Sequence, residues 1–262
     1  MITAHGQEAW AGADAAGIGT GGVIHAELLC EAVDVHPGEQ VLDVAAGDGA
    51  AGLAAARRGA DVIATDLIDH VLQFAARVAE ASCLPLRTQV ADPQDLPFDD
   101  DTFDVVLSSF GTMFAPDQQR VADELVRVCR PCGRIGLVSW SPVSLVADLL
   151  RATASHVQSS SVLNRAVEWG SEDRLRQLFG NRVRPIRVEP RRFTFRYRSA
   201  EHILESFRDR DGPIRAALDS LGRDGQAALA ADLIQVFRRF NRADDGTLVA
   251  PSHYLEIVAV VR

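Results

Sequence analysis

A chain of 262 residues, 47% of them hydrophobic, can bury one sizeable core but is too short for two typical domains with a linker, so we predict one compact domain. Its net charge of −9 repels polyanions, which disfavours nucleic acid as a partner. No window approaches the roughly 18 apolar residues of a membrane span, and the start has no basic stretch followed by an apolar run, so we expect a soluble, cytoplasmic protein without a membrane partner.

Short apolar runs alternate with helical segments through the first half of the chain. Residues 40–45 predict a strand, residues 49–59 a helix that ends at a glycine, and residues 60–65 a second strand. This alternation is typical of a parallel sheet covered by helices on both faces. The pattern continues with a helix at 67–83, strands at 86–90 and 103–110, a helix at 116–130 and a strand at 134–140.

After residue 140 the pattern changes to helices interrupted by one alternating strand. Phe193, Phe195 and Tyr197 alternate with polar residues and predict that strand, and residues 253–261 predict a last one. Arginines crowd the stretch 174–198, but their alternation with apolar residues favours the solvated side of a strand, so we assign them no role. Helices are predicted near 143–157, 171–179, 200–210 and 224–240.

The four cysteines predict neither a disulfide scaffold nor a metal site. Cys129 and Cys132 form a single CxxC pair, whereas a zinc site needs about four ligands, and the sequence has neither a second such pair nor two histidines at HxxxH spacing. We interpret the pair as a turn between a helix and a strand and predict no metal.

A loop of small residues follows the first predicted strand. Ala45, Ala46, Gly47 and Gly49 lie where the strand turns into a helix, and side chains this small let a ligand lie against the backbone. The helix start also offers unpaired N–H groups to a pyrophosphate or to an amino-acid carboxylate. Because the loop fits GxGxxG with Asp66 following, as in dinucleotide-binding units, a nicotinamide-dependent oxidoreductase stays open as an alternative.

Asp43 and Asp92 favour S-adenosylmethionine over a nicotinamide cofactor, whereas Asp66 fits both. Asp43 lies inside the first strand, where a carboxylate needs a cationic or hydrogen-bonding partner such as a methionyl ammonium group. Asp66 ends the second strand and suits the ribose hydroxyls of either cofactor. Asp92 ends the third strand and offers an acceptor for an adenine amino group, which nothing in a hydride-transfer site requires.

Four sequence blocks occur between residues 41 and 140 in the order typical of one enzyme family: VLDVAAGDG, IATDL, ADPQDLPFDDDTFDVVLSSFGTMFAPD and ADELVRVCRPCGRIGLVSW. Together they resemble the type 11 class I S-adenosylmethionine-dependent methyltransferases, relatives of the ubiquinone and menaquinone methyltransferases and of many bacterial small-molecule methyltransferases. The later segments WGSEDRLRQLFG, FNRADDGTL and YLEIV resemble an actinobacterial branch, so the similarity extends over most of the chain.

The resemblance implies a fold and an activity. The fold is Rossmann-like α/β, a seven-stranded, mostly parallel sheet with an antiparallel last strand, helices on both faces and an added helical lid. The activity is methyl transfer from S-adenosylmethionine to a small, hydrophobic or aromatic acceptor; the choice of N, O or C acceptor, a non-catalytic S-adenosylmethionine-binding role and the oligomeric state, a homodimer included, stay open. Within one domain, 1–262, we predict cap helices at 1–35, a cofactor-binding core at 36–141, lid helices and the sixth strand at 142–250, and the last strand at 251–262.

The resemblance also implies how the cofactor is held. Asp43 and the loop backbone would hold the methionyl end, Asp66 the ribose and Asp92 the adenine edge. This sequence departs from the family at Ala45, which replaces a glycine, and at Pro93, which lacks the N–H that the family offers to the adenine ring. The loss is about one hydrogen bond, roughly 0.5 to 1.5 kcal/mol, unless Gln94 or a water replaces it. The predicted cofactor-binding residues are Asp43, Ala45, Ala46, Gly47, Gly49, Asp66, Leu67, Ala91, Asp92, Pro93, Gln94, Ser108 and Ser109.

The acceptor side is predicted from aromatic residues and histidines. The driving force resides in the cofactor, so no fixed catalytic dyad is required, but a phenol or alcohol acceptor benefits from a base. His25 and His156 are the candidates, because both lie in regions that cap the cofactor in the resembled family. Phe110 and Met113 follow the fourth strand at its carboxyl end, where open parallel sheets bind ligands. With Trp10 and Trp140 they predict an apolar wall, although core packing explains such residues too.

Overall fold

The computed structural model describes residues 21–157, 160–209 and 212–262. Its centre is one seven-stranded sheet in the order β3-β2-β1-β4-β5-β7-β6, in which β7 runs antiparallel to both of its neighbours. The predicted sheet with its antiparallel last strand is thereby confirmed. The strands are β1 (Gln40–Val44), β2 (Asp61–Asp66), β3 (Leu86–Val90), β4 (Phe103–Ser109), β5 (Cys129–Trp140), β6 (Arg187–Tyr197) and β7 (Leu248–Val260).

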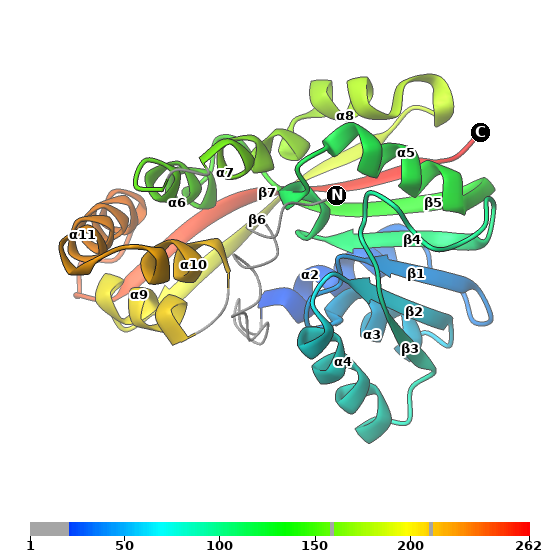
Figure 1. The fold of residues 1–262 in the computed structure, drawn as a ribbon, viewed down its shortest axis with the longest axis horizontal. Helices are drawn as coiled ribbons and strands as arrows, with labels where there is room; N and C mark the ends of the chain where they lie inside the picture. Colours follow the sequence, from blue (N-terminus) through cyan, green and yellow to red (C-terminus); the bar gives the residue numbers. More distant parts are fainter. Residues whose placement is uncertain (1–20, 158–159, 210–211) are drawn as a thin grey trace.

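Helices cover both faces of the parallel strands, and a second group surrounds the far ends of β6 and β7 (Figure 1). The first face carries α2 (Gly21–Ala32), α3 (Ala50–Arg57) and α4 (Asp69–Ala81), and the opposite face carries α5 (Gln118–Val128) and α8 (Glu172–Phe179). The second group contains α6 (Leu145–Ala154), α7 (Ser160–Ala166), α9 (Ala200–Asp209), α10 (Pro213–Ser220) and α11 (Arg223–Phe240). Short 3-10 turns are η1 (Thr112–Phe114), η2 (Val167–Gly170) and η3 (Gly180–Arg182).

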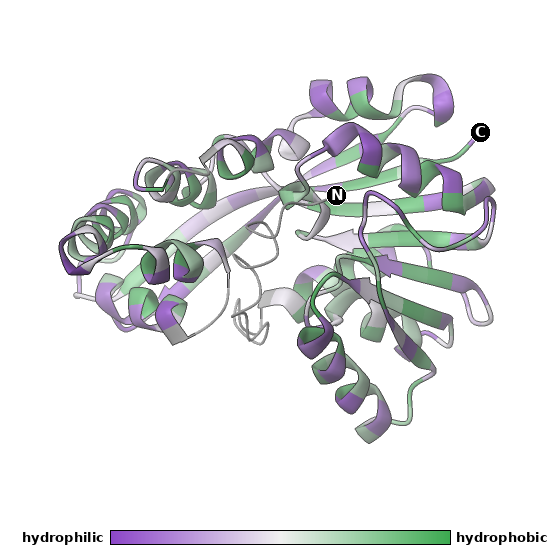
Figure 2. Cartoon of the chain, viewed as in Figure 1, coloured by the Kyte–Doolittle hydropathy of each residue, from purple (hydrophilic) through white to green (hydrophobic). Residues whose placement is uncertain are grey.

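Amphipathic patterning explains why these helices form and where they pack. In α5, Val121, Leu125 and Val128 recur at helical spacing and are fully buried, while Arg120 and Asp123 are exposed. Its first turn is capped by Asp117, whose carboxylate accepts from the backbone N–H of Arg120 at 3.0 Å. Figure 2 shows the same division, with hydrophobic colour along the central strands and hydrophilic colour on the outer faces of α5 and α8.

The chain departs from the predicted elements in three places. Neither α7 nor α10, both short, is predicted from the hydrophobic pattern. The last strand begins at Leu248, before the predicted 251, because residues 248–252 already pair with β6. The cysteine pair is not a turn outside the sheet: β5 begins at Cys129, and the irregular pairing before Arg134 accommodates the left-handed φ of 61° at Cys132.

The arginine-rich stretch includes β6, which is the outermost strand of the sheet in the described part of the chain and pairs with β7. On it Phe195 is buried, whereas Arg192 and Arg196 are exposed, as the alternation predicts. Charged side chains on an edge strand hinder pairing with another chain. Arg191 differs, because it donates a hydrogen bond of 2.9 Å to the buried carboxylate of Glu256. Among the described residues no helix is both long and apolar enough to cross a membrane.

Candidate functional site

The loop after β1 lies at the carboxyl ends of the parallel strands and has an unusual backbone. Ala45, Gly47 and Gly49 have φ values of 53°, 55° and 76°, all in the left-handed region. The backbone N–H of Ala46 donates to Thr65 on β2 at 2.8 Å, which ties the loop to the neighbouring strand. A β-carbon on Gly49 would lie 2.6 Å from that of Ala75, so α4 packs against the loop only because residue 49 is a glycine.

Asp43 provides a test of whether this site suits a cationic group. Its side chain is fully buried; one oxygen accepts from the backbone N–H of Gly52 at 2.7 Å, and the other has no hydrogen-bond partner among the described residues. Burial raises the pKa of the Asp43 carboxyl to about 7, against the opposing effect of the Gly52 hydrogen bond. A buried carboxylate with one unused oxygen fits a cationic partner such as the methionyl ammonium group.

Asp66 joins the end of β2 to the same loop. Its carboxylate accepts from the backbone N–H of Gly47 at 2.9 Å and from that of Ile68 at 3.1 Å. Burial raises the pKa of this carboxyl, while hydrogen bonds from Gly47, Ile68 and Leu67 oppose the rise. A carboxylate offers about four lone-pair positions, so Asp66 can still accept from a hydroxyl donor beside these backbone groups.

The next carboxylate along the edge of the sheet, Asp92, is partly exposed and follows β3. The backbone N–H of Gln94 donates to it at 2.9 Å, and the Gln94 side-chain amide lies 3.2 Å from the same oxygen. Pro93 between them is buried, and Ala91 donates its N–H to the carbonyl of Asp66 at 3.0 Å. Asp43, Asp66 and Asp92 thus follow the edge of the sheet from β1 to β3.

The segment after β4 closes the other side of the β1 loop. Ser108 is fully buried and its hydroxyl accepts from the N–H of Thr112 at 3.2 Å, whereas Ser109 is half-buried. Phe110 has a left-handed φ of 61°. A β-carbon on Gly111 would lie 2.1 Å from the carbonyl oxygen of Ala45, so the backbones of the two loops are in direct contact. This contact fixes Phe110 beside the loop.

Phe110 belongs to a group of rings that we call the aromatic cluster. It stacks on Trp140 with ring centroids 4.4 Å apart. The ring centroid of His25, a residue that is only 3% exposed, lies 5.0 Å from that of Phe110. Phe193 and Tyr254 complete the cluster, with centroids 5.0 and 4.6 Å from His25. The structure therefore brings together three predicted residues from α2, β5 and the segment after β4.

Phe193 and Tyr254 are members of the aromatic cluster that the sequence analysis misses. Both are aromatic positions of strands, and period-2 alternation places each on one face of its strand. The alternation does not tell which strand lies next to β5. The rings come together because Trp140 pairs with Tyr254 and Phe193 pairs with Ser252.

The other predicted acceptor residues lie elsewhere or are not described. Met113 is 1% exposed, with its sulfur 3.7 Å from the Ser139 hydroxyl, so it packs in the core rather than forming an exposed wall. The Nε2 atom of His156 lies 2.7 Å from the carboxylate of Asp232 on α11, and no ring contact joins it to the aromatic cluster within the described ranges. Trp10 lies outside the described residues.

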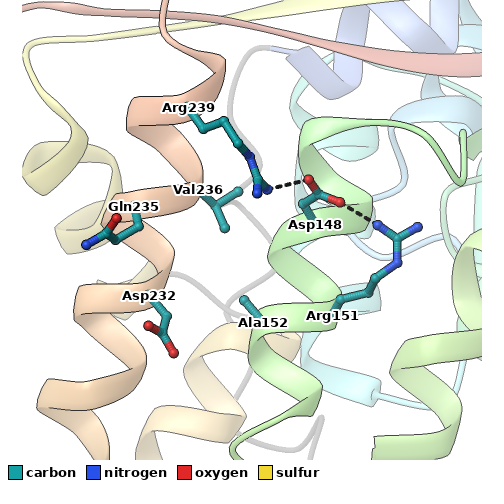
Figure 3. A pocket seen from close by; sticks show the side chains of 7 residues that line it. All are labelled: Asp148, Arg151, Ala152, Asp232, Gln235, Val236 and Arg239. Carbon is teal, nitrogen blue, oxygen red and sulfur yellow. Dashed lines mark hydrogen bonds and ion pairs between the residues drawn. The ribbon is translucent and has the colours of Figure 1, made fainter.

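A surface groove of about 460 Å³ runs between α6 and α11 (Figure 3). Asp148 lies in it between Arg151 and Arg239 and forms an ion pair with each, so the two guanidinium groups share one carboxylate. None of the predicted cofactor residues lines this groove, and we assign it no ligand. Its lining consists of Asp148, Arg151, Ala152, Asp232, Gln235, Val236 and Arg239.

The raised pKa of Asp43 predicts a pH dependence of stability in the cofactor-free protein. The folded pKa of about 7 lies above the ordinary value of 3.8, so between these values the folded state binds more protons than the unfolded state. The contribution of Asp43 to the free energy of unfolding is therefore complete below pH 4 and is lost as the pH rises through 7. The loss is on the order of a few kcal/mol. Urea unfolding at pH 5 and pH 7.5 should show this loss in the wild type and a smaller one in Asp43→Asn. Equal losses in the two proteins would contradict the assignment.

Comparison with known proteins connects this geometry to one family. A family model described as a methyltransferase domain matches residues 42–137. An uncharacterized protein of Mycobacterium tuberculosis is 40% identical over 212 residues, which cover 79% of this chain and 75% of that protein. A demethylmenaquinone methyltransferase of Clavibacter sepedonicus is 35% identical over 153 residues, covering 53% and 62%. The crystal structure of the YcgJ protein of Bacillus subtilis shares the fold, with a TM-score of 0.64, 18% identity and coverage of 91% and 98%.

Proposed function

Because the chain belongs to the class I S-adenosylmethionine-dependent methyltransferases, we propose that it methylates a small, flat, hydrophobic or aromatic acceptor held against the aromatic cluster. Family membership decides between the two cofactors that the glycine loop alone leaves open. The observation that carries the acceptor class is the position of Phe110, stacked on Trp140 and directly preceding the glycine that contacts the β1 loop. The net charge of −9 further supports a small molecule over a nucleic acid as acceptor.

S-adenosylmethionine, when bound, supplies a methyl group on a positively charged sulfur. The acceptor attacks the methyl carbon in line and the sulfur is the leaving group. In our proposal the unused oxygen of Asp43 receives the ammonium group, Asp66 the ribose hydroxyls and Asp92 the amino group of the base. Leu67 packs on the adenine, and Ser108 and Ser109 border the methionyl portion. In the same proposal the rings around His25, of which Trp140 and Tyr254 are buried, exclude water from the acceptor and keep it oriented toward the methyl group.

His25 is our candidate base for an acceptor that loses a proton. Its imidazole is surrounded by Phe110, Trp140, Phe193 and Tyr254, the rings that we expect to contact a flat acceptor. A histidine in this position can take the proton of a phenol as the oxygen is methylated. We also propose that α6, α7 and α9 to α11 form the lid on the acceptor side, supported by the hydrogen bond that Val146 at the start of α6 donates to Ser252 of β7, at 3.3 Å.

Calorimetry with S-adenosylmethionine, S-adenosylhomocysteine and NAD, followed by an acceptor screen, tests the proposal. We expect micromolar binding of the two sulfur compounds, and release of S-adenosylhomocysteine with phenolic or quinol acceptors. His25→Gln should lower kcat for a phenol by about 10² to 10⁴ and leave S-adenosylhomocysteine affinity within about threefold. The matched control is His253→Gln, at an exposed histidine of β7. Cofactor binding without turnover of any flat apolar acceptor would refute the acceptor class, and NAD binding alone would refute the cofactor site.

A further inference from the structure

One face of β5, β7 and β6 carries a charged pair directly beside the aromatic cluster. Tyr254 of β7 pairs with Trp140 of β5 on one side and with Arg191 of β6 on the other. Side chains of directly paired residues lie on the same face, with β-carbons about 4.5 to 5.5 Å apart. Glu256, two positions along β7, shares this face, and its carboxylate accepts from Arg191 at 2.9 Å. We call Tyr254, Arg191 and Glu256 the polar end of the aromatic cluster.

The Tyr254 hydroxyl is a donor at the polar end that the protein itself does not use. The residue is only 3% exposed, and buried tyrosine hydroxyls usually have a hydrogen-bond partner. Within residues 21–157, 160–209 and 212–262, no group forms a hydrogen bond with this hydroxyl. Burial and the negative charge of Glu256 raise its pKa, while Arg191 opposes the rise. Tyr254 therefore keeps its proton at neutral pH and can donate it to a ligand in a hydrogen bond.

Arg191 provides further donors next to this hydroxyl. A guanidinium group has five N–H donors, and the Arg191 side chain uses a terminal nitrogen on Glu256. Its other side-chain nitrogens have no hydrogen-bond partner in the part of the chain that the structure describes. The Arg191 side chain is 43% exposed, so the polar end is open to solvent. A ligand oxygen can therefore reach donors of both residues.

The charges at the polar end favour a neutral oxygen over an anionic one. The carboxylate of Glu256, a buried residue, already balances the Arg191 charge. Glu189, which pairs with Glu256 across the ladder, also acts on Arg191. A carboxylate on the acceptor would add a further negative charge to this group. A carbonyl oxygen accepts hydrogen bonds from Tyr254 and Arg191 without that repulsion.

We propose that the polar end binds a neutral carbonyl oxygen of the acceptor, with Tyr254 and Arg191 as its donors, so that the substrate is a flat aryl ketone or a related neutral carbonyl compound. This inference rests on the proposed placement of the acceptor against the aromatic cluster. In the sheet β6 is the strand farthest from β1 on this side, so the carbonyl lies at the end of the acceptor remote from the β1 loop. Tyr254 and Arg191 are specificity-determining residues, which select and orient the acceptor.

The test is calorimetry on the full chain in the presence of S-adenosylhomocysteine, with three probes substituted at the same ring carbon. Acetylnaphthalene carries a carbonyl oxygen, isopropenylnaphthalene has a methylene group in its place, and naphthoate carries a carboxylate. Comparing the ketone-to-alkene affinity ratio between proteins cancels the difference in hydration of the two probes. Tyr254→Phe removes only the hydroxyl and should lower this ratio by about 3- to 10-fold.

Tyr197→Phe is the matched control, because the Tyr197 ring lies 5.7 Å from that of His202 and outside the aromatic cluster. It should retain the wild-type ratio, and thermal melts verify that each variant is folded. Glu256→Gln removes the buried negative charge beside Arg191. It should strengthen the binding of naphthoate by about 3- to 10-fold and change the binding of acetylnaphthalene by less than about twofold.

An ion pair that only ties β6 to β7 would lower the Tm of Glu256→Gln without changing its affinity for naphthoate, and this result would overturn the inference. An unchanged ketone-to-alkene ratio in a folded Tyr254→Phe protein would overturn it as well, as would a wild type that binds naphthoate more tightly than acetylnaphthalene. Failure of all three probes to bind beside S-adenosylhomocysteine would instead overturn the acceptor site on which the inference rests.

Discussion

Gly111→Ala is expected to destabilise the protein by about 3 kcal/mol or more and to abolish cofactor binding. The added β-carbon would lie 2.1 Å from the carbonyl oxygen of Ala45 and 2.6 Å from its β-carbon. Both atoms belong to, or are attached directly to, the backbone, so no side-chain rotation relieves the clash. The β1 loop and the segment after β4 must separate, and the loop positions the Gly47 N–H that contacts Asp66 and the start of α3.

Thermal unfolding measures this effect, with an expected fall in Tm of about 6 to 12 °C for a domain of this size. The control is Gly225→Ala within α11, where the nearest atoms to the new β-carbon are the Leu221 side chain at 3.3 Å. That substitution should be neutral or slightly stabilising, because alanine favours helix over glycine. A Gly111→Ala protein that melts with the wild type would show that the two loops do not touch.

Asp66→Ala is expected to weaken S-adenosylhomocysteine binding by about 100-fold or more. Two hydrogen bonds from ribose hydroxyls to a carboxylate contribute about 1.5 to 3 kcal/mol each, and the substitution also removes the acceptor for the Gly47 N–H. Asp61→Asn is the control, since Asp61 is exposed at the opposite end of β2, where it accepts from the Gln40 side chain at 3.0 Å. The Asp61→Asn protein should bind S-adenosylhomocysteine with the affinity of the wild type.

A deoxy analogue separates the ribose contact from damage to the loop. The wild type should lose affinity for 2′-deoxy-S-adenosylhomocysteine relative to the parent compound, whereas Asp66→Ala should bind the two alike. If the mutant still discriminates against the deoxy analogue as strongly as the wild type, the ribose is read by another residue.

The core of the fold could be predicted because its signals are local. β1 and β4 are buried on both faces, so each reads as a continuous apolar run with no competing period. Asp43 stands out because a carboxylate inside such a run is costly unless it has a partner. The short α7 and α10 are not predicted, and length alone does not explain this, since α3 and α8 also have eight residues each and are predicted.

The acceptor side could be predicted only in part because it depends on tertiary neighbours. His25 and Trp140 are 115 positions apart, and neither residue type specifies which strand or helix faces it. Met113 illustrates the reverse error: an apolar residue at the carboxyl end of β4 suits a ligand wall, yet η1 turns it into the core. The groups that contact a ligand and the groups that fill the core have the same chemistry here, and sequence pattern does not separate them.

The length of β6 and β7 constrains how the two halves of the molecule can move. Residues 254–260 of β7 pair with β5, and residues 248–258 pair with β6. One continuous ladder therefore runs from the parallel strands to the helices beyond them (Figure 1). Swinging those helices outward as a hinged body would break or sharply bend that ladder. Ligand exchange should therefore proceed by local displacement of helices such as α2, which no strand pairing ties to the sheet, while the two halves keep a fixed angle.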